Sequence, residues 1–293
     1  MANDRTFHVE EPTELLPFLL EKLPEKGRNK VKGLLTHHQV KVNNKVVTRH
    51  DVPLTPGQLV TVVVSGVAQK ETLHGIQIVH EDDDVIVIDK PPGLLSIATD
   101  EEREQTAYRI LMDYVRRKRP ENRIFIVHRL DRETSGLMLF AKSESVQQAL
   151  QHNWKNTVQK RLYVVVVEGQ VNKTEDTIKC WLKESSTHTM YVCKPGDGVL
   201  SVTHYKTLKS TEYYSLLEVE LETGRKNQIR VHMQSIGHSV LGDKRYGAKT
   251  NPLDRLALHA RVLNFRHPVT SEVLQFETKI PPAFQSLFPG NRS

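Results

Sequence analysis

Apolar residues recur at helical spacing in two places near the start of the chain, residues 14–23 and residues 29–37. Valines then alternate with other residues along residues 40–47 and residues 60–64, which predicts a hairpin followed by one more strand. Two short helices and a small curled sheet make an α/β module. We place this module at residues 1–70.

Beyond residue 70 most apolar segments are short and rich in β-forming residues, so they predict strands. Examples are residues 85–88, 124–127 and 162–167. Residues 105–118 carry an apolar face at helical spacing and predict a helix. Many strands with few helices between them favour an α+β domain on a mixed, largely antiparallel sheet, and residues 71–293 have the size of one domain.

Charge narrows the class of partner. The 293-residue chain has a formal net charge of +6. Between residues 24 and 50 there are seven basic residues and one acid, Glu25, so this stretch alone has a surplus of six, seven minus one. The basic residues are Lys26, Arg28, Lys30, Lys32, Lys41, Lys45 and Arg49. Such a local basic surface favours a polyanion, most often nucleic acid.

Other classes find little support in the sequence. No apolar run reaches the ~20 residues of a membrane helix, and the first residues lack the pattern of a secretory signal. Cys180 and Cys193 have only His188 between them as a further soft ligand, too few for a zinc site. The sequence shows no nucleotide-binding loop. We expect a cytoplasmic protein with reduced thiols, no metal, no cofactor and no membrane association.

The segment that carries most chemical information is residues 128–136, between two predicted strands. It places Asp131 among the guanidinium groups of Arg129 and Arg132. Neighbouring arginines favour the ionised form of a carboxylate. An ionised aspartate at the end of a strand can act as a nucleophile or stabilise charge. At this point a salt-bridged turn without chemistry explains the segment equally well.

Two further segments contain residues suited to binding RNA. Tyr163 lies early in an aliphatic strand, where it is either a core aromatic or a stacking platform for a nucleobase with a hydroxyl able to move a proton. Residues 221–232 leave a strand, turn at Gly224 and enter a predicted helix, a place where free N–H groups bind anions. Arg225 and Arg230 would not share a helix face. One could hold a phosphate while the other reaches inward, or both could be surface arginines.

The ordered set of motifs resembles the RNA pseudouridine synthases of the RluA type. The segments in order are His-Arg-Leu-Asp with Thr-Ser-Gly, Lys-Arg-Leu-Tyr with a closing glycine where the family pattern is Lys-x-Tyr, Thr-Gly-Arg with Gln-Ile-Arg, Gly-Asp-x-x-Tyr-Gly and Leu-His-Ala. They run from Lys90 to about Pro268. Asn227 stands where the family usually has histidine, and Ser96 lies in a loop that often carries one. The first module resembles the S-four-like RNA-binding motif, with an Asn43-Asn44 turn in place of Asn-Gly.

The resemblance implies a reaction and residue roles. The uridine C–N glycosidic bond breaks, the base turns, and it is rejoined through C5, without a cofactor. By the match Asp131 is the catalytic carboxylate, Arg230 its ion-pair partner, and Tyr163 the residue that stacks on the base and is a candidate for late proton removal. Arg129 fills the gap left by the flipped uridine. The remaining substrate-binding candidates are Arg132, Arg225, Lys160 and Lys90.

The expected partner is structured RNA, either ribosomal or transfer RNA, and we expect a monomer. Two other functions remain open at this stage. A glycosidase-like hydrolase would need a second carboxylate, for which Glu133 is the near candidate. A catalytically silent RNA-binding or ribosome-assembly factor would use the basic module alone. The presence of Asp131, Tyr163 and Arg230 together favours the synthase, because binding alone does not require all three.

Overall fold

The computed structural model of the chain describes residues 5–36, 39–62, 72–73 and 75–288. It divides into two units, one of Met1–Leu73 with Gln77–Val87 and the other of His74–Ile76 with Ile88–Ser293. The boundary that we placed at residue 70 stays a prediction, and residues 63–71 and 74 around it lie outside the described residues. Within the described residues, no helix combines the length and hydropathy needed to cross a membrane.

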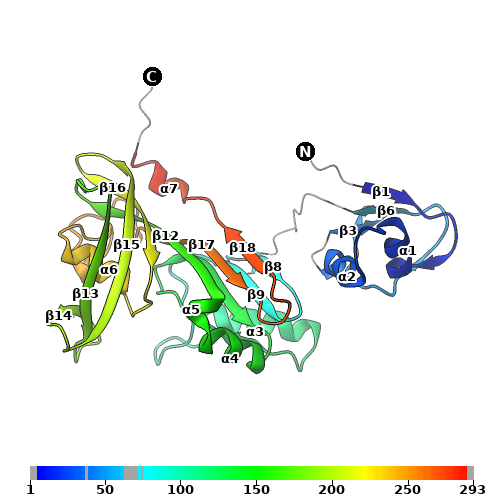
Figure 1. Cartoon of the computed structure of the whole chain (residues 1–293), viewed down its shortest axis with the longest axis horizontal. Helices are drawn as coiled ribbons and strands as arrows, with labels where there is room; N and C mark the ends of the chain where they lie inside the picture. The colour runs from blue at the N-terminus through cyan, green and yellow to red at the C-terminus, as the bar shows by residue number, and fades with distance from the viewer. Residues whose placement is uncertain (1–4, 37–38, 63–71, 74, 289–293) are drawn as a thin grey trace, which may run out of the picture. The chain divides into compact units, whose positions relative to one another are not determined.

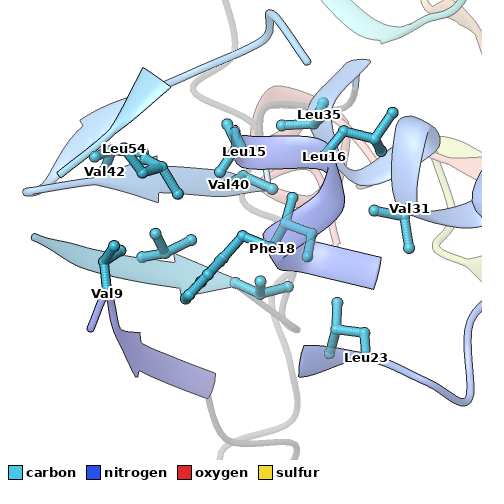
Figure 2. Close-up of a cluster of buried hydrophobic side chains, with 13 residues drawn as sticks. Val9, Leu15, Leu16, Phe18, Leu23, Val31, Leu35, Val40, Val42 and Leu54 are labelled. Atoms are coloured by element: carbon cyan, nitrogen blue, oxygen red, sulfur yellow. The ribbon is translucent and has the colours of Figure 1, made fainter. Parts of the chain in front are cut away.

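The first unit contains the two predicted helices packed on a small sheet. The helices are α1 (Leu15–Lys22) and α2 (Arg28–Thr36). The sheet has the order β1 (Arg5–His8), β6 (Leu59–Val62), β3 (Val40–Val42) and β4 (Lys45–Val46), and β2 (Thr13–Glu14) pairs with β5 (Pro53–Leu54). Figure 2 shows the hydrophobic core of this unit, in which leucines and Phe18 of α1 pack against valines of the sheet.

The hairpin turn in this unit follows from its residue types. Asn43 and Asn44 have φ values of 48° and 65°. Asparagine adopts this left-handed region more readily than other residues with a side chain, so the turn forms without glycine. Gly57, in the turn before β6, has φ 87°. The end of the last predicted strand, residues 63–64, lies outside the described residues.

Among the described residues, the strands of the larger unit belong to one mixed sheet, shown in Figure 1. Twelve strands belong to this sheet in the described part of the chain. Along the sheet the order is β14 (Met190–Cys193), β13 (Glu175–Glu184), β15 (Val199–Ser210), β16 (Tyr214–Leu221), β12 (Val158–Glu168), β17 (Leu258–Arg266), β11 (Ser135–Ala141), β9 (Val85–Lys90), β8 (Ile76–Glu81) and β7 (Thr72–Leu73). β10 (Phe125–Ile126) pairs with β11, and β18 (Val273–Glu277) pairs with β17.

Helices cover this sheet in two groups. α4 (Glu144–His152) and α5 (Trp154–Thr157) contact β10, β11 and β12, and α3 (Ala107–Lys118) precedes them along the chain. α6 (Gln228–Ser235) packs on β13, β14 and β15, near the short 3-10 turn η1 (Lys244–Tyr246). α7 (Pro282–Gln285) completes the set. Thr106 and Ser143 accept hydrogen bonds from the first turns of α3 and α4, which explains where these helices begin.

The register of three strands brings distant segments of the chain together. β11 runs parallel to β17, with Gly136 opposite Ala260, and β12 runs antiparallel to β17, with Tyr163 opposite the same Ala260. Gly136 has φ +111°, and a Cβ at this position would lie 2.2 Å from the Ala260 carbonyl oxygen. Only glycine fits this approach. The segment just before β11 and Tyr163 of β12 therefore lie on either side of the same part of β17.

Candidate active site

Asp131 lies between β10 and β11, where its carboxylate meets α6. Arg230 Nη1 donates a hydrogen bond to Asp131 Oδ2 at 3.2 Å. The same guanidinium makes shorter bonds to Asp243, 2.6 Å from Nε to Oδ2 and 2.8 Å from Nη2 to Oδ1. Burial acts to lower the pKa of Arg230, but the carboxylates of Asp243 and then Asp131 raise it above its usual value. The expected pair of Asp131 and Arg230 is present, with Asp243 as the stronger holder of the arginine.

Exposure falls from one end of this network to the other. The side chain of Asp131 is 28% exposed, that of Arg230 is 14% exposed, and that of Asp243 is 1% exposed. The guanidinium carbon of Arg230 also lies 4.8 Å from the centre of the Tyr246 ring. A buried arginine held by a bidentate carboxylate and an aromatic face has little freedom to move. The network is thus fixed inside the protein and opens to solvent at Asp131.

Asn227 contacts Asp131 from a second direction. It is buried, with φ 52°, immediately before α6. With the amide nitrogen toward Asp131, it donates at 2.8 Å to Oδ2 and 3.1 Å to Oδ1, and its oxygen accepts from the Tyr246 hydroxyl at 2.9 Å. The opposite orientation would set the amide oxygen against the carboxylate. The backbone N–H of Met190 donates to the same hydroxyl at 3.2 Å, which favours the hydroxyl as the donor to Asn227.

The loop after β9 holds the backbone on both sides of Asp131. The Ser96 hydroxyl donates to the Leu130 carbonyl at 2.6 Å and accepts from the Leu130 N–H at 3.1 Å. Lys90 Nζ donates to the carbonyl of Arg132 at 3.0 Å and to those of Pro91 and Leu94 at 2.9 and 2.7 Å. Lys90 is fully buried, and burial lowers its pKa to about 7. The catalytic candidate is therefore clamped through its two neighbours in sequence.

A small pocket of about 80 Å³ opens at Asp131. Tyr163, Arg129 and Arg225 line it together with Asn227 and Arg230. Tyr163 is buried, and burial raises the pKa of its hydroxyl. The pocket continues into a wider groove of about 870 Å³, because Arg129, Tyr163, Leu221 and Arg225 line both. Lys160 lines only the wider groove.

Two of the predicted substrate-binding residues, Lys90 and Arg132, line neither the small pocket nor the wider groove. Among the described residues, Lys90 Nζ donates to three backbone carbonyls and so holds the loop, and its expected role in substrate binding stays a prediction. Arg132 is exposed and lines neither the pocket nor the groove. Arg225 precedes α6, which begins at Gln228, so Arg225 and Arg230 do not lie on one helix as the sequence suggested.

Several residues of the site were not singled out from the sequence. Asp243 and Tyr246 lie in the Gly-Asp-x-x-Tyr-Gly motif, which we expected beside the site without assigning roles to its members. Asn227 and Ser96 attracted notice only as departures from a family pattern. In each case the missing information was the distance to Asp131, which spacing along the chain does not give.

Comparisons with known proteins agree with this geometry. Residues 84–235 match the model of the RNA pseudouridylate synthase family, and this range includes Asp131, Tyr163 and Arg230. The chain belongs to this family of isomerases, in the RluA/RluD type, with a small module before the catalytic domain. The expected α+β fold on a mixed sheet, preceded by a small α/β module, is thereby confirmed.

Individual relatives cover most of the chain. The chain is 32% identical to the Bacillus subtilis protein called uncharacterized RNA pseudouridine synthase YlyB, over 99% of this chain and 98% of that one. It is 31% identical to ribosomal large subunit pseudouridine synthase D of Haemophilus influenzae, over 92% and 88% of the two chains. Among solved structures, human RNA pseudouridylate synthase domain containing 1 superposes with a TM-score of 0.56 at 26% identity, covering 70% of this chain and 84% of that one.

Proposed function

We propose that this RNA pseudouridine synthase uses Asp131 as its catalytic carboxylate and acts on structured ribosomal RNA. The observation that supports this most directly is the hydrogen bonding of Asp131 to Arg230 and Asn227, which holds the carboxylate at the mouth of the small pocket. An ionised carboxylate at the mouth of a small pocket can attack the ribose or the base, or remove a ribose proton. The arginine keeps negative charge favourable in a partly buried setting.

Tyr163 is assigned the role of a stacking surface for the flipped uracil. Because burial raises the pKa of its hydroxyl, the phenol stays protonated at neutral pH. This supports contact through the ring and a donated hydrogen bond more than removal of a proton from C5. Arg129 and Arg225 are exposed at the junction of the pocket and the groove, where they suit the RNA backbone or the space left by the flipped base. Lys160 adds a further basic side chain to the wider groove.

Ribosomal RNA is preferred over transfer RNA on two grounds. Relatives such as that of Haemophilus influenzae carry names that refer to the large ribosomal subunit. The first unit presents exposed cations on α2, among them Arg28 and Lys30, as a module for structured RNA would. We propose that this module is S-four-like and adds affinity without chemistry. Replacing Arg28 and Lys30 by glutamine should weaken binding and flatten its salt dependence while leaving kcat unchanged.

A glycosidase-like hydrolase fits the site less well. That reaction normally uses two carboxylates on either side of the scissile bond. Asp131 is the only acid among the described residues that line the small pocket, and Glu133 is exposed and lines neither cavity. A silent RNA-binding factor would not need the buried network that holds Asp131.

The test of the proposal is Asp131→Asn, compared with Asp197→Asn on an exposed turn as a matched control. The asparagine preserves shape but cannot act as an anionic nucleophile or base, so pseudouridine formation should fall by several orders of magnitude. RNA affinity should stay within about tenfold, equivalent to ~1.4 kcal/mol. Pseudouridine is mapped on ribosomal and transfer RNA from cells that lack the protein and from cells given each variant. Continued conversion by Asp131→Asn would show that another residue is catalytic.

A further inference from the structure

The wider groove contains a stack of side chains that the reaction at Asp131 does not use. The guanidinium carbon of Arg161 lies 5.4 Å from the centre of the Trp154 ring. The His128 ring also contacts Trp154, with 5.2 Å between ring centres and 47° between planes. A Cβ added at Gly224 would lie 3.2 Å from Arg161 Nη1 and 3.6 Å from Nη2. Arg161 is thus held by an indole and by backbone that carries no side chain.

The charge on Arg161 is not neutralised by an acid. Among the described residues, Arg161 makes no ion pair or side-chain hydrogen bond, whereas Arg230 and Arg261 each bond to two carboxylates. Glu220 and Glu222 also line the groove, but neither forms an ion pair with Arg161, and the Glu222 carboxylate bonds to His204 at 3.3 Å. Arg161 therefore offers a fixed guanidinium whose donors remain available to a ligand.

The third side chain of the stack, His128, adds no competing charge. His128 Nε2 accepts the Leu139 N–H at 3.0 Å, which leaves the proton on Nδ1. Burial, and then the charge of Arg161, lower the pKa of His128 to about 3. His128 is therefore neutral and supports Trp154 from within the protein. The arrangement presents one cation on an aromatic platform at the surface of the groove.

We propose that Arg161 binds one backbone phosphate of the RNA strand beside the nucleotide that enters the small pocket. This inference rests on the proposed function and adds to it a specific anchor. A planar guanidinium matches a phosphate with two parallel hydrogen bonds, and prior fixing by Trp154 reduces the entropy lost on binding. The groove shares Arg129 and Arg225 with the pocket, so a strand in the groove is continuous with a base in the pocket.

Gly224 belongs to the same anchor. Its neighbour along the chain, Arg225, lines both cavities, and a side chain at residue 224 would press on the guanidinium of Arg161. A glycine here lets the arginine lie flat between the turn and the indole. The Thr-Gly-Arg segment thereby contributes to the groove through its missing side chain as well as through its arginine.

The experiment measures binding of Asp131→Asn protein, which does not turn over, to an RNA stem-loop with one unpaired uridine. A set of stem-loops carries a single neutral methylphosphonate at each loop linkage in turn. With Arg161 intact, one linkage should cost about tenfold in affinity when neutralised. Combining Arg161→Gln with Asp131→Asn should lower the affinity for unmodified RNA by a similar factor. The double variant should no longer respond to neutralisation of that one linkage, and its slope of log K against log salt should be smaller by about 0.7.

Controls separate this contact from general electrostatics and from misfolding. Lys209→Gln removes one exposed charge far along β15 and should leave the methylphosphonate profile unchanged. Trp154→Phe keeps an aromatic surface and should retain the profile, whereas Trp154→Leu should lose it with an unchanged melting temperature. The chain has two tryptophans, so Trp181→Phe leaves Trp154 as the only one, and its emission should change when RNA binds.

Loss of affinity at every linkage alike, or a profile that Arg161→Gln does not alter, would overturn the phosphate anchor. Because the measured quantity is RNA affinity and not conversion of uridine, the anchor is tested whether or not Asp131 is catalytic. A protein that forms pseudouridine but shows no Arg161-dependent linkage refutes only the anchor. A protein that shows the linkage but forms no pseudouridine refutes only the proposed function.

Discussion

Ser96→Ala tests whether the clamp on the backbone next to Asp131 matters for catalysis. The serine is 2% exposed and Leu130 5% exposed, so water does not readily replace the lost hydroxyl. The change leaves one N–H and one carbonyl of Leu130 without their partner. An unsatisfied buried group costs about 1–3 kcal/mol, so two cost about 2–6 kcal/mol before relaxation. At roughly 2–4 °C per kcal/mol, the melting temperature should fall by about 4 °C or more.

The effect on activity should exceed the effect on stability. Asp131 follows Leu130 directly, and a small displacement of a catalytic group can reduce the rate by about a hundredfold. We expect kcat of Ser96→Ala to fall tenfold to a hundredfold, measured well below the melting temperature, with RNA affinity unchanged. The matched control is Ser143→Ala, which removes the N-cap of α4 and costs about 1 kcal/mol.

The control determines how the result is interpreted. Ser143 caps a helix away from Asp131, so its loss should lower stability without altering kcat. If kcat of Ser96→Ala equals that of the unchanged protein, the clamp has no catalytic role. If the two serine variants lose kcat in the same proportion to their loss of stability, the effect is general destabilisation and the reasoning about Asp131 fails.

Three other predictions follow from the same geometry. Gly136→Ala should lower the free energy of unfolding, measured with urea, by more than about 4 kcal/mol, because its Cβ would meet Ala260. Gly93→Ala, at φ +81° with open space around it, should lower it by only about 1–2 kcal/mol. Equal losses would contradict the role of the close approach. Asn227→Leu removes both amide contacts to Asp131, so kcat should fall about tenfold with unchanged RNA affinity, and an unaltered kcat would dismiss Asn227 as a positioning residue. Because burial lowers the pKa of Lys90 to about 7, the unfolded chain binds more protons than the folded chain above this pH. The free energy of unfolding, relative to that of Lys90→Met, should therefore rise between pH 7 and about 10, by at most ~1.4 kcal/mol per pH unit. A difference between the two proteins that does not change with pH would refute this.

Much of the architecture could be predicted from the sequence because its signals are local. The helical spacing at residues 14–23 and 105–118 gave α1 and α3 within a few residues of their observed ends. The Asn43-Asn44 turn and the valines of β12 were similarly clear. The long strands β13 and β15 and the helix α4 were not predicted, because their solvent-facing sides are polar and irregular and their stability comes from packing on neighbouring elements.

The site was predictable only as far as its motifs extend. Asp131, Tyr163 and Arg230 come together because β12 and β17 share a register and α6 follows β16. Lys90 could not be placed, since a lysine in a Lys-Pro-Pro-Gly loop gives no sign of whether its amine faces a substrate or three carbonyls. Trp154 and Arg161 lie seven positions apart on different elements, and their contact depends on the turn from α5 into β12.

The hydrogen bonds to Asp131 are distributed unequally between its two oxygens. Oδ2 accepts from Arg230 at 3.2 Å and from Asn227 at 2.8 Å, whereas Oδ1 has, within the described part of the chain, only the longer 3.1 Å contact with the same amide. Each carboxylate oxygen can accept about two hydrogen bonds. Oδ2 is therefore occupied in holding the side chain in place, and Oδ1 keeps a lone pair for the substrate. If Asp131 acts as proposed, Oδ1 is the oxygen that forms or breaks a bond, while the arginine and the amide hold Oδ2 still throughout the reaction.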